Sequence, residues 1–301
     1  MNKKLTEAGK FAHEGIDTSA SIISAVFKLL SVTQADLSIT SEMSQTFQVD
    51  EFQLGDELPG YNPGNNLSEI NKTNNQGELY LVCQGRVRLL STATNRQREV
   101  SCLVLETGEI FGGDNLLCDR EITDTSNLLA YRSVAASHGA IARISFTKLQ
   151  TYFPKISGLE ESLRSTVKQR QYQIFCKTTT DLGILTSHQL REIIPYLIEK
   201  QIPAGNSLAT VTPGEIGRYW LRSGQITSQE PIIPIENNGH KPQSNQQKLI
   251  APCPTVGASW GYPEPPPADW IAHSDLVIYQ VSTEHWQSLQ NIAPNYFKIS
   301  G

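Results

Sequence analysis

The spacing of apolar residues changes several times along the chain, and each change predicts a different kind of element. Residues 1–32 begin polar and end in apolar side chains at helical spacing, which predicts one amphipathic helix. Its apolar face would pack on the body of the protein or on a partner, and the pattern leaves both open. Residues 33–76 contain turn signals such as Pro59-Gly60 and are predicted to be rich in loops.

Short runs of apolar and β-branched residues follow from Gly77 to about Ser145, separated by turn residues. Short strands at such regular intervals predict an antiparallel sandwich or barrel. The runs predicted as strands are 78–83, 87–90, 100–105 and 140–144.

Helical spacing returns in residues 146–200. A long helix is predicted from Leu159 to Phe175, and a second helix follows a predicted N-cap at Ser187. Pro203 and the residues after it end the helical zone, and strands return. The chain is therefore predicted to alternate between β-rich and helical zones.

Three landmarks of the β-rich zones recur in the same order. The paired segments are 80–87 with 219–226, 108–113 with 257–261, and 140–145 with 277–282. In each copy a strand, a glycine and a second strand precede a glycine-rich turn with an aromatic residue, and a last strand leads into a helix. The nearly constant offset between the copies favours a duplicated β-rich unit.

This order resembles the cyclic-nucleotide-binding domain, a β jelly roll with flanking helices and a phosphate-binding cassette between two strands. The residues that carry the resemblance are 77–82 with Gly85, 108–113, and 136–145. The resemblance implies a mainly β fold with flanking helices, built from two jelly-roll units in tandem. The predicted parts are an N-terminal helical segment 1–44, a first jelly roll 45–158, connecting helices 159–189, and a second, degenerate jelly roll 190–301.

The paired arrangement also looks like the N-terminal cytoplasmic segment of cyanobacterial ABC-type peptide exporters. The second-copy segments that carry this likeness are 219–221 and 260–264. It implies an ABC transporter whose peptidase, membrane and ATPase portion follows residue 301, so that this chain would be a fragment of it. The protein would then lie in the cytoplasm, tethered at the inner face of the membrane, and regulate peptide export.

The cassette of the first copy has residues suited to an anion. A cyclic phosphate binds where backbone N–H groups converge, and glycines let the backbone come close enough. Gly112 and Gly113 meet this requirement. The resemblance implies a carboxylate for the ribose hydroxyl, and Asp114 stands there in place of the usual Glu. The structural alternative is a tight connection from strand to helix, with Asp114 as the cap.

The resemblance also implies an arginine for the phosphate, but the expected position falls on Ala130. Arg132 lies two residues further along, on the same face of a strand, and is predicted to substitute for it. Ser133 completes the predicted site, and Arg120 of the cassette loop is another candidate.

The second copy lacks these groups. No arginine follows Arg222, and the cassette region contains Pro263 and Pro265–Pro267, which remove backbone donors. This copy is therefore predicted to be a packing or docking unit. Any of its aromatic side chains that are exposed would serve as interface anchors.

Composition and charge exclude several classes of protein. The 25 basic and 30 acidic residues give a net charge of −5, which argues against nucleic acid as a partner. The basic residues of the long helix are interpreted as its solvated face; they are Arg164, Lys168, Arg170 and Lys177. No apolar run reaches the roughly 20 residues of a membrane span. Five dispersed cysteines without a C-x-x-C motif indicate buried thiols in a reducing cytoplasm.

Catalytic motifs are weak throughout. Residues 257–261 match the G-x-S-x-G elbow, but the prolines around them break the strand and helix that the motif needs. The six histidines never lie two apart, so no metal site of the cupin type is predicted. We therefore expect no enzyme and no cofactor. The prediction is a regulatory module that binds a cyclic mono- or dinucleotide in its first unit and acts on an exporter portion or a protein partner. The alternative is a docking tandem with both pockets empty.

Overall fold

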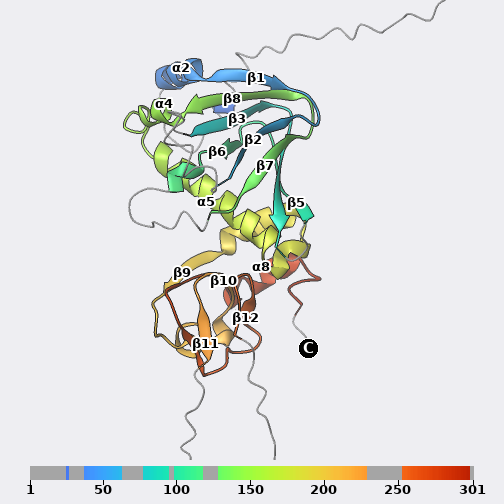
Figure 1. Ribbon diagram of the computed structural model, residues 1–301, viewed down its shortest axis with the longest axis vertical. Helices are drawn as coiled ribbons and strands as arrows, with labels where there is room; N and C mark the ends of the chain where they lie inside the picture. Colours follow the sequence, from blue (N-terminus) through green and yellow to red (C-terminus); the bar gives the residue numbers. More distant parts are fainter. Residues whose placement is uncertain are drawn as a thin grey trace, which may run out of the picture.

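The computed structural model describes residues 25–26, 37–62, 77–94, 98–117, 128–228 and 253–298. Two β units lie at opposite ends of the molecule, and a long helix runs between them (Figure 1). The prediction of a mainly β fold with flanking helices, built from two jelly-roll units, is confirmed.

The first unit contains two four-stranded antiparallel sheets, ordered β1-β8-β3-β6 and β2-β7-β4-β5. Its strands are β1 (Gln48–Phe52), β2 (Glu57–Tyr61), β3 (Glu78–Gln84), β4 (Val87–Ala93), β5 (Arg98–Leu105), β6 (Ile110–Gly112), β7 (Tyr131–Ala135) and β8 (Gly139–Ser145). Burial alternates along β4, as expected for a strand with one face in the core and one in solvent. Phe111, Leu89 and Ile141 are among the side chains that fill the core.

The four predicted strands correspond to β3, β4, β5 and β8, but the loop-rich prediction for 33–76 is wrong in part. This segment also contains the helix α2 (Leu37–Thr46) and the strands β1 and β2. Pro59-Gly60 lies inside β2, where the pairing with β7 shifts register. Since β2 is an edge strand of its sheet, a proline is tolerated there. The Pro59-Gly60 pair therefore belongs to an irregular strand and not to a turn.

The amphipathic helix predicted in residues 1–32 lies largely outside the described residues. Ala25 and Val26 are described, are helical, and are fully buried in a core with Leu81 and Leu163. These two residues therefore pack on the body of the protein.

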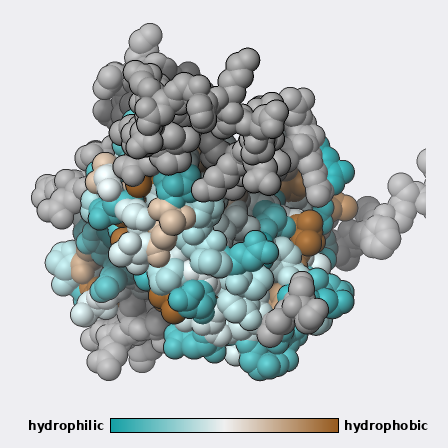
Figure 2. Space-filling view, turned by 90° about the horizontal axis from the view of Figure 1, so that it is seen from below, coloured by the Kyte–Doolittle hydropathy of each residue, from teal (hydrophilic) through white to brown (hydrophobic). Residues whose placement is uncertain are grey.

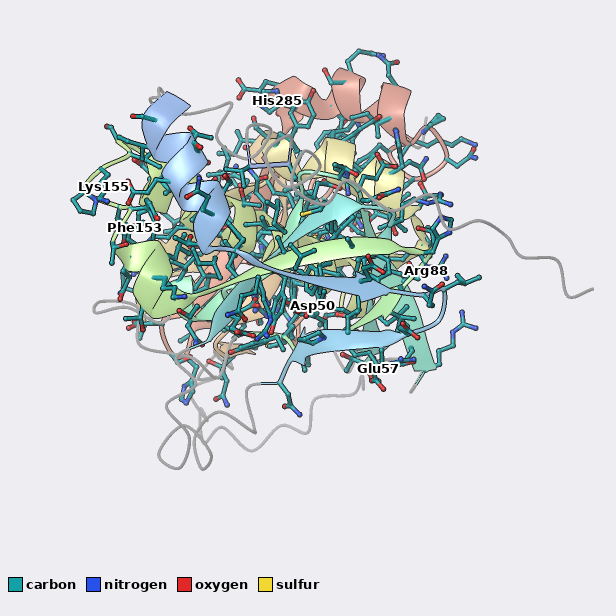
Figure 3. The ribbon with its side chains drawn as sticks, turned by 90° about the horizontal axis from the view of Figure 1, so that it is seen from above. Asp50, Glu57, Arg88, Phe153, Lys155 and His285 are labelled. Carbon is teal, nitrogen blue, oxygen red and sulfur yellow. The ribbon has the colours of Figure 1, made fainter. Side chains whose placement is uncertain are left out.

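The outer surface of the first unit is charged. Arg143 pairs with Asp50 of β1 at 2.9 Å, and Lys155 pairs with Glu42 of α2 at 2.8 Å. Figure 3 looks down on this end, with Asp50 along β1 and Lys155 at the edge beside α2.

The connecting zone contains α4 (Phe146–Gln150), the 20-residue helix α5 (Leu159–Thr178), a 3-10 turn η3 (Asp181–Ile184) and α6 (Ser187–Ile193). The predicted N-cap at Ser187 is wrong by one position. Thr186 is the cap, and it forms a capping box with Gln189.

The second unit has one four-stranded sheet and, among its described residues, one two-stranded sheet, β11-β13. Its elements are β9 (Ile198–Ile202), α7 (Leu208–Val211), β10 (Gly217–Ser223), β11 (Ile226–Ser228), β12 (Ser259–Gly261), β13 (Trp270–Ala272), β14 (Leu276–Ser282) and α8 (Trp286–Ile292). The larger sheet has the order β9-β14-β10-β12, which matches β1-β8-β3-β6 strand for strand. All four tryptophans are at most 7% exposed and belong to the core of this unit.

Two glycines occupy matching places at the ends of β6 and β12. Gly112 and Gly261 have φ of 70° and 91°, which favours glycine. A Cβ on Gly112 would lie 2.5 Å from the carbonyl oxygen of Glu78, and a Cβ on Gly261 would lie 2.4 Å from that of Gly217. Each glycine therefore permits the same close backbone approach.

The aromatic residues before these glycines also match. Phe111 stacks on Tyr80 with ring centroids 4.9 Å apart, and Trp260 stacks on Tyr219 at 5.7 Å. Seen from below, the described surface is mostly hydrophilic, with apolar residues in small separate patches (Figure 2). None of the helices in the described part of the chain is both long and apolar enough to cross a membrane.

Candidate ligand-binding cassette

The predicted cassette lies where β6 ends and a short 3-10 turn, η1 (Asp114–Leu117), begins. Gly112 and Gly113 both have positive φ, so the chain turns sharply before the buried Asp114. The Asp114 side chain is 0% exposed. The structure therefore brings these three predicted residues together.

Three side chains donate hydrogen bonds to the buried Asp114 carboxylate. Tyr131 Oη lies 2.7 Å from Oδ2, and Arg170 Nη2 lies 3.1 Å from the same oxygen. Gln171 Nε2 lies 2.9 Å from Oδ1. Tyr131 belongs to β7, whereas Arg170 and Gln171 belong to α5. The carboxylate thus joins the first unit to the long helix.

Arg170 reaches the cassette backbone as well. Its Nη2 donates to the Gly112 carbonyl at 2.5 Å, and its Nη1 donates to the Ile110 carbonyl at 3.2 Å. The guanidinium also lies over the Tyr131 ring, 5.4 Å from its centroid. Burial opposes the charged form, but the attraction of Asp114 and Tyr131 outweighs it and raises the pKa of Arg170. Arg170 and Asp114 therefore form a buried ion pair.

Arg170 is the site residue that sequence reasoning missed. The prediction that Arg170 lies on the solvated face of the helix is wrong, because its side chain is 2% exposed. The spacing of the apolar residues in α5 indicates that Arg170 is buried. Arg170 follows Leu163 and Val167 and precedes Ile174 at helical intervals, so it lies on the buried face of α5.

Arg132 is not brought to the cassette. It lies on the outer face of β7, where its Nε and Nη2 bond the two carboxylate oxygens of Glu99 at 2.5 and 2.7 Å. This hydrogen bonding lowers the pKa of Glu99. Ala130 is exposed on the same face, whereas Tyr131 faces inward. The side chains alternate along the strand, so Arg132 points away from Asp114.

Ser133 lies on the inner face of β7 and is fully buried. Its Oγ has no hydrogen-bond partner among the described residues, and the same holds for Arg170 Nε. Arg120 lies outside the described residues.

The second unit departs from the cassette after Gly261. Tyr262 and Pro263 stand where the first unit has Gly113 and Asp114. The amide of Tyr262 donates to the Gly217 carbonyl at 2.8 Å, as the amide of Gly113 donates to the Glu78 carbonyl at 3.0 Å, so the two units differ in side chains and not in this backbone bond. The side chains present there do not form a second cassette.

Ser259, the serine of the G-x-S-x-G match, belongs to a structural network. Its Oγ lies 3.1 Å from Asp181 Oδ2 and 3.0 Å from Arg218 Nη2. Asp181 also accepts from Trp220 Nε1 at 2.8 Å. This network fixes the second unit to the turn that follows α5.

Metal ligands do not gather in the described part of the chain, which contains no group of three or more His, Cys, Asp or Glu able to hold an ion. The described cysteines are all free. Cys83, Cys102 and Cys176 are buried, as predicted for structural thiols, whereas Cys253 is only partly buried.

The sequence matches no protein-family model and no curated protein. Among solved structures, the regulatory domain of Toxoplasma gondii protein kinase A, determined with cAMP, is 14% identical, with 92% of this chain and 94% of that chain covered and a TM-score of 0.34. The Trypanosoma brucei regulatory subunit of a cAMP-independent protein kinase A is 13% identical, with 94% and 90% covered and a TM-score of 0.34. The catabolite activator protein of Thermus thermophilus is 19% identical, with 49% and 59% covered and a TM-score of 0.35. Likeness of this size assigns neither a ligand nor a site.

Proposed function

We propose that this chain is a regulatory module without catalytic activity, whose first unit binds a cyclic nucleotide at Gly112, Gly113 and Asp114. The observation that carries the proposal is the junction of Asp114 with Arg170, a carboxylate and a guanidinium 3.1 Å apart at the end of β6. A cyclic nucleotide offers a partner to each charge. Its ribose hydroxyl donates to a carboxylate, and its phosphate accepts charge-assisted bonds from a guanidinium.

Unused hydrogen-bonding capacity supports the same site. Arg170 Nε and Ser133 Oγ are buried and have no partner among the described residues. Because native proteins leave few buried polar atoms unpaired, such atoms favour a ligand site. In this proposal Ser133 and Arg170 bind the phosphate, while Arg132 stays with Glu99.

Ligand binding is coupled to α5 in this proposal. Arg170 and Gln171 hold the helix to Asp114, so a ligand that engages Asp114 competes with these bonds. The equilibrium shifts only if the ligand binds the released arrangement more tightly. The released helix then repositions the second unit or a protein partner.

The second unit is a degenerate copy of the first in this proposal, and it packs or docks without binding a nucleotide. The matched strand order and the matched pair Gly112 and Gly261 support the duplication. The boundaries of the four parts, 1–44, 45–158, 159–189 and 190–301, belong to the proposal. In this proposal the chain regulates an ABC-type peptide exporter that is joined to it in the cytoplasm. Only the sequence resemblance supports this part of the proposal.

A second candidate function is docking without a ligand. Ser133 is 0% exposed and Asp114 is 2% exposed, and Asp114 already accepts bonds from three side chains. A closed cassette of this kind favours a scaffold whose surface binds a protein partner.

Calorimetric titration with cyclic AMP, cyclic GMP and cyclic dinucleotides separates the two functions. If the chain is a nucleotide sensor, it binds one of these ligands. Arg170→Gln then weakens the binding of that ligand about tenfold or more, because a charged donor to the phosphate is lost. Arg132→Gln is the matched control at the exposed ion pair, and it leaves the affinity unchanged.

The absence of heat from every one of these ligands at millimolar concentration contradicts sensing and favours docking. Circular dichroism shows whether Arg170→Gln still folds. Hydrogen exchange of the unaltered protein gives a second test that needs no variant. Bound nucleotide must change exchange in α5, and an unaltered α5 would contradict the coupling.

A further inference from the structure

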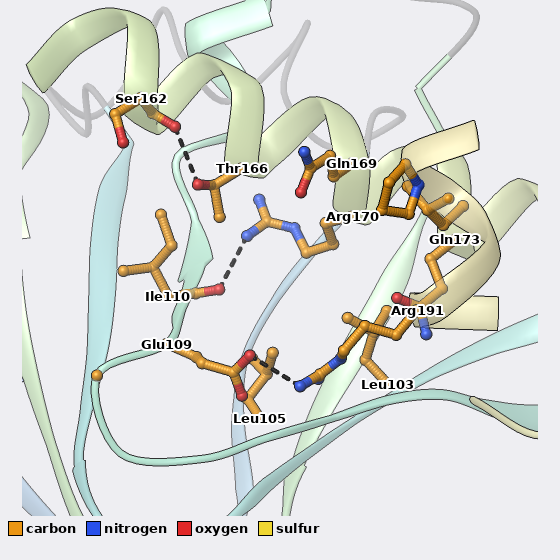
Figure 4. A pocket seen from close by; sticks show the side chains of 13 residues that line it. Leu103, Leu105, Glu109, Ile110, Ser162, Thr166, Gln169, Arg170, Gln173 and Arg191 are labelled. Atoms are coloured by element: carbon orange, nitrogen blue, oxygen red, sulfur yellow. Dashed lines mark hydrogen bonds and ion pairs between the residues drawn. The ribbon is translucent and has the colours of Figure 1, made fainter. Parts of the chain in front are cut away.

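A cavity of about 270 Å³ lies between the first unit and the connecting helices, apart from the Asp114 carboxylate (Figure 4). Its floor is β5 and the turn into β6. One wall is α5, and the other is the end of α6 with the residues that follow it. This volume is close to the lower end of the range for small-molecule sites, about 300 Å³.

The walls of the cavity differ in chemistry. Leu105 and Ile110 on the floor and Ile194 on the far wall present apolar surface and are each at most 5% exposed. The α5 wall carries polar side chains, including Thr166 and Gln169. The cavity therefore has an apolar interior that suits a hydrocarbon or aromatic group.

An ion pair closes one side of the cavity. Arg191 Nη1 lies 3.1 Å from Glu109 Oε1, and the two side chains are 47% and 31% exposed. Each partner is also anchored to the backbone. Arg191 Nη2 donates to the Val104 carbonyl at 3.0 Å, and Glu109 Oε2 accepts from the Glu106 amide at 2.7 Å. Both charges would therefore stay at this position if the pair opened.

The charges around the cavity balance. Arg170 is neutralised by Asp114 beneath it, and Arg191 is neutralised by Glu109 beside it. A net anion such as a nucleotide gains little from a neutral site. A molecule with one positive and one negative group gains more, because it exchanges one ion pair for two.

We propose that this cavity binds a free α-amino acid with an apolar side chain. Its carboxylate forms an ion pair with Arg191, and its ammonium forms an ion pair with Glu109. Its side chain packs on Leu105, Ile110 and Ile194. The bound amino acid would bridge the β5–β6 turn and α6, and so hold the first unit against the connecting helices.

Calorimetry with L-phenylalanine and two of its derivatives tests the proposal on the unaltered chain. We expect one molecule of phenylalanine to bind per chain. Phenylalanine amide lacks the carboxylate, and N-acetylphenylalanine lacks the ammonium. Each should bind about tenfold more weakly or worse, because each loses one charge-assisted contact.

Two variants assign the contacts. Arg191→Gln should make phenylalanine and its amide bind equally, and Glu109→Gln should make phenylalanine and its N-acetyl derivative bind equally. Arg88→Gln, on the outer face of β4, is the matched control and should change nothing. The proposal is overturned if phenylalanine does not bind at millimolar concentration, if the three compounds bind alike, or if both variants behave like the control. Arg170 lines both the cavity and the cassette, but no nucleotide enters this experiment, so its outcome is distinguishable from that of the nucleotide titration.

Discussion

At the residue scale, the ion pair of Asp114 and Arg170 is the most consequential contact in the first unit. Both side chains are at most 2% exposed, so neither charge can turn to water if its partner is lost. Breaking a buried pair by removing one partner is strongly destabilising, whereas replacing both partners costs much less.

Arg170→Met should lower the free energy of unfolding by about 3–5 kcal/mol, because it leaves the Asp114 carboxylate buried and without its cation. The double variant Asp114→Asn with Arg170→Met should recover part of this loss. Chemical denaturation measures both. Arg132→Met, at an exposed ion pair, is the control and should have a clearly smaller effect. Equal losses at Arg132 and Arg170 would contradict the importance assigned to burial.

The alternation of β7 explains why one arginine was predicted for the site and another occupies it. Arg132 lies near the cassette in sequence, but its side chain is on the outer face of the strand. Arg170 lies far from the cassette in sequence and reaches it only because α5 packs across the end of β6. Where side chains alternate between two faces of a strand, a residue that lies near a motif in sequence need not contact it in the structure.

At the element scale, β6 and β12 end in the same way in both units. Each strand is only three residues long and finishes at a glycine with positive φ. Gly112 lies against the ring of Tyr80, and Gly261 lies against the ring of Tyr219. The glycine is therefore required by the packing of each sheet, independently of any ligand.

Gly112→Ala and Gly261→Ala should each destabilise the protein by more than the roughly 1–2 kcal/mol of left-handed backbone strain, because the added Cβ also meets a carbonyl oxygen. Gly205→Ala provides the control. Gly205 also has a positive φ, at 86°, but a Cβ there would meet nothing within 4 Å. Thermal unfolding of the three variants measures the difference, and a cost at Gly112 no larger than at Gly205 would refute this account.

The strands that sequence reasoning missed in residues 33–76, β1 and β2, have little apolar pattern. Only one residue in each of these two strands, Phe52 and Tyr61, is buried. Since both strands lie at sheet edges, their sequences need not alternate clearly. Sheet pairing, which the local sequence does not encode, decides their structure.

At the scale of the whole molecule, α5 is held by both units. Arg170 joins it to the first unit through Asp114, and Tyr172 Oη donates to Glu199 of β9 at 2.7 Å. Asp181, just after the helix, accepts from Trp220 of β10 at 2.8 Å. A displacement of α5 in one unit must therefore strain its contacts with the other.

Asp181→Ala should loosen the second unit specifically. It leaves the indole N–H of Trp220 without its acceptor, a loss of about 1–3 kcal/mol for a buried donor. Hydrogen exchange should rise in β10 and β12, while the first unit is unaffected. Asp50→Ala removes an exposed ion pair from β1 and serves as the control. Equal changes in both units would indicate that Asp181 does not act as a local anchor.

The sequence by itself determined the β-rich units, the long helix between them and the glycines of the cassette. These features follow from local periodicity and from backbone geometry that a few residues impose. Only the tertiary structure decided which charged groups meet at the cassette. Asp114 and Arg170 are 56 residues apart along the chain, and their contact depends on how α5 packs against the sheet. The same dependence explains Arg191 and Glu109, whose pairing at one side of the cavity arises from packing between distant elements.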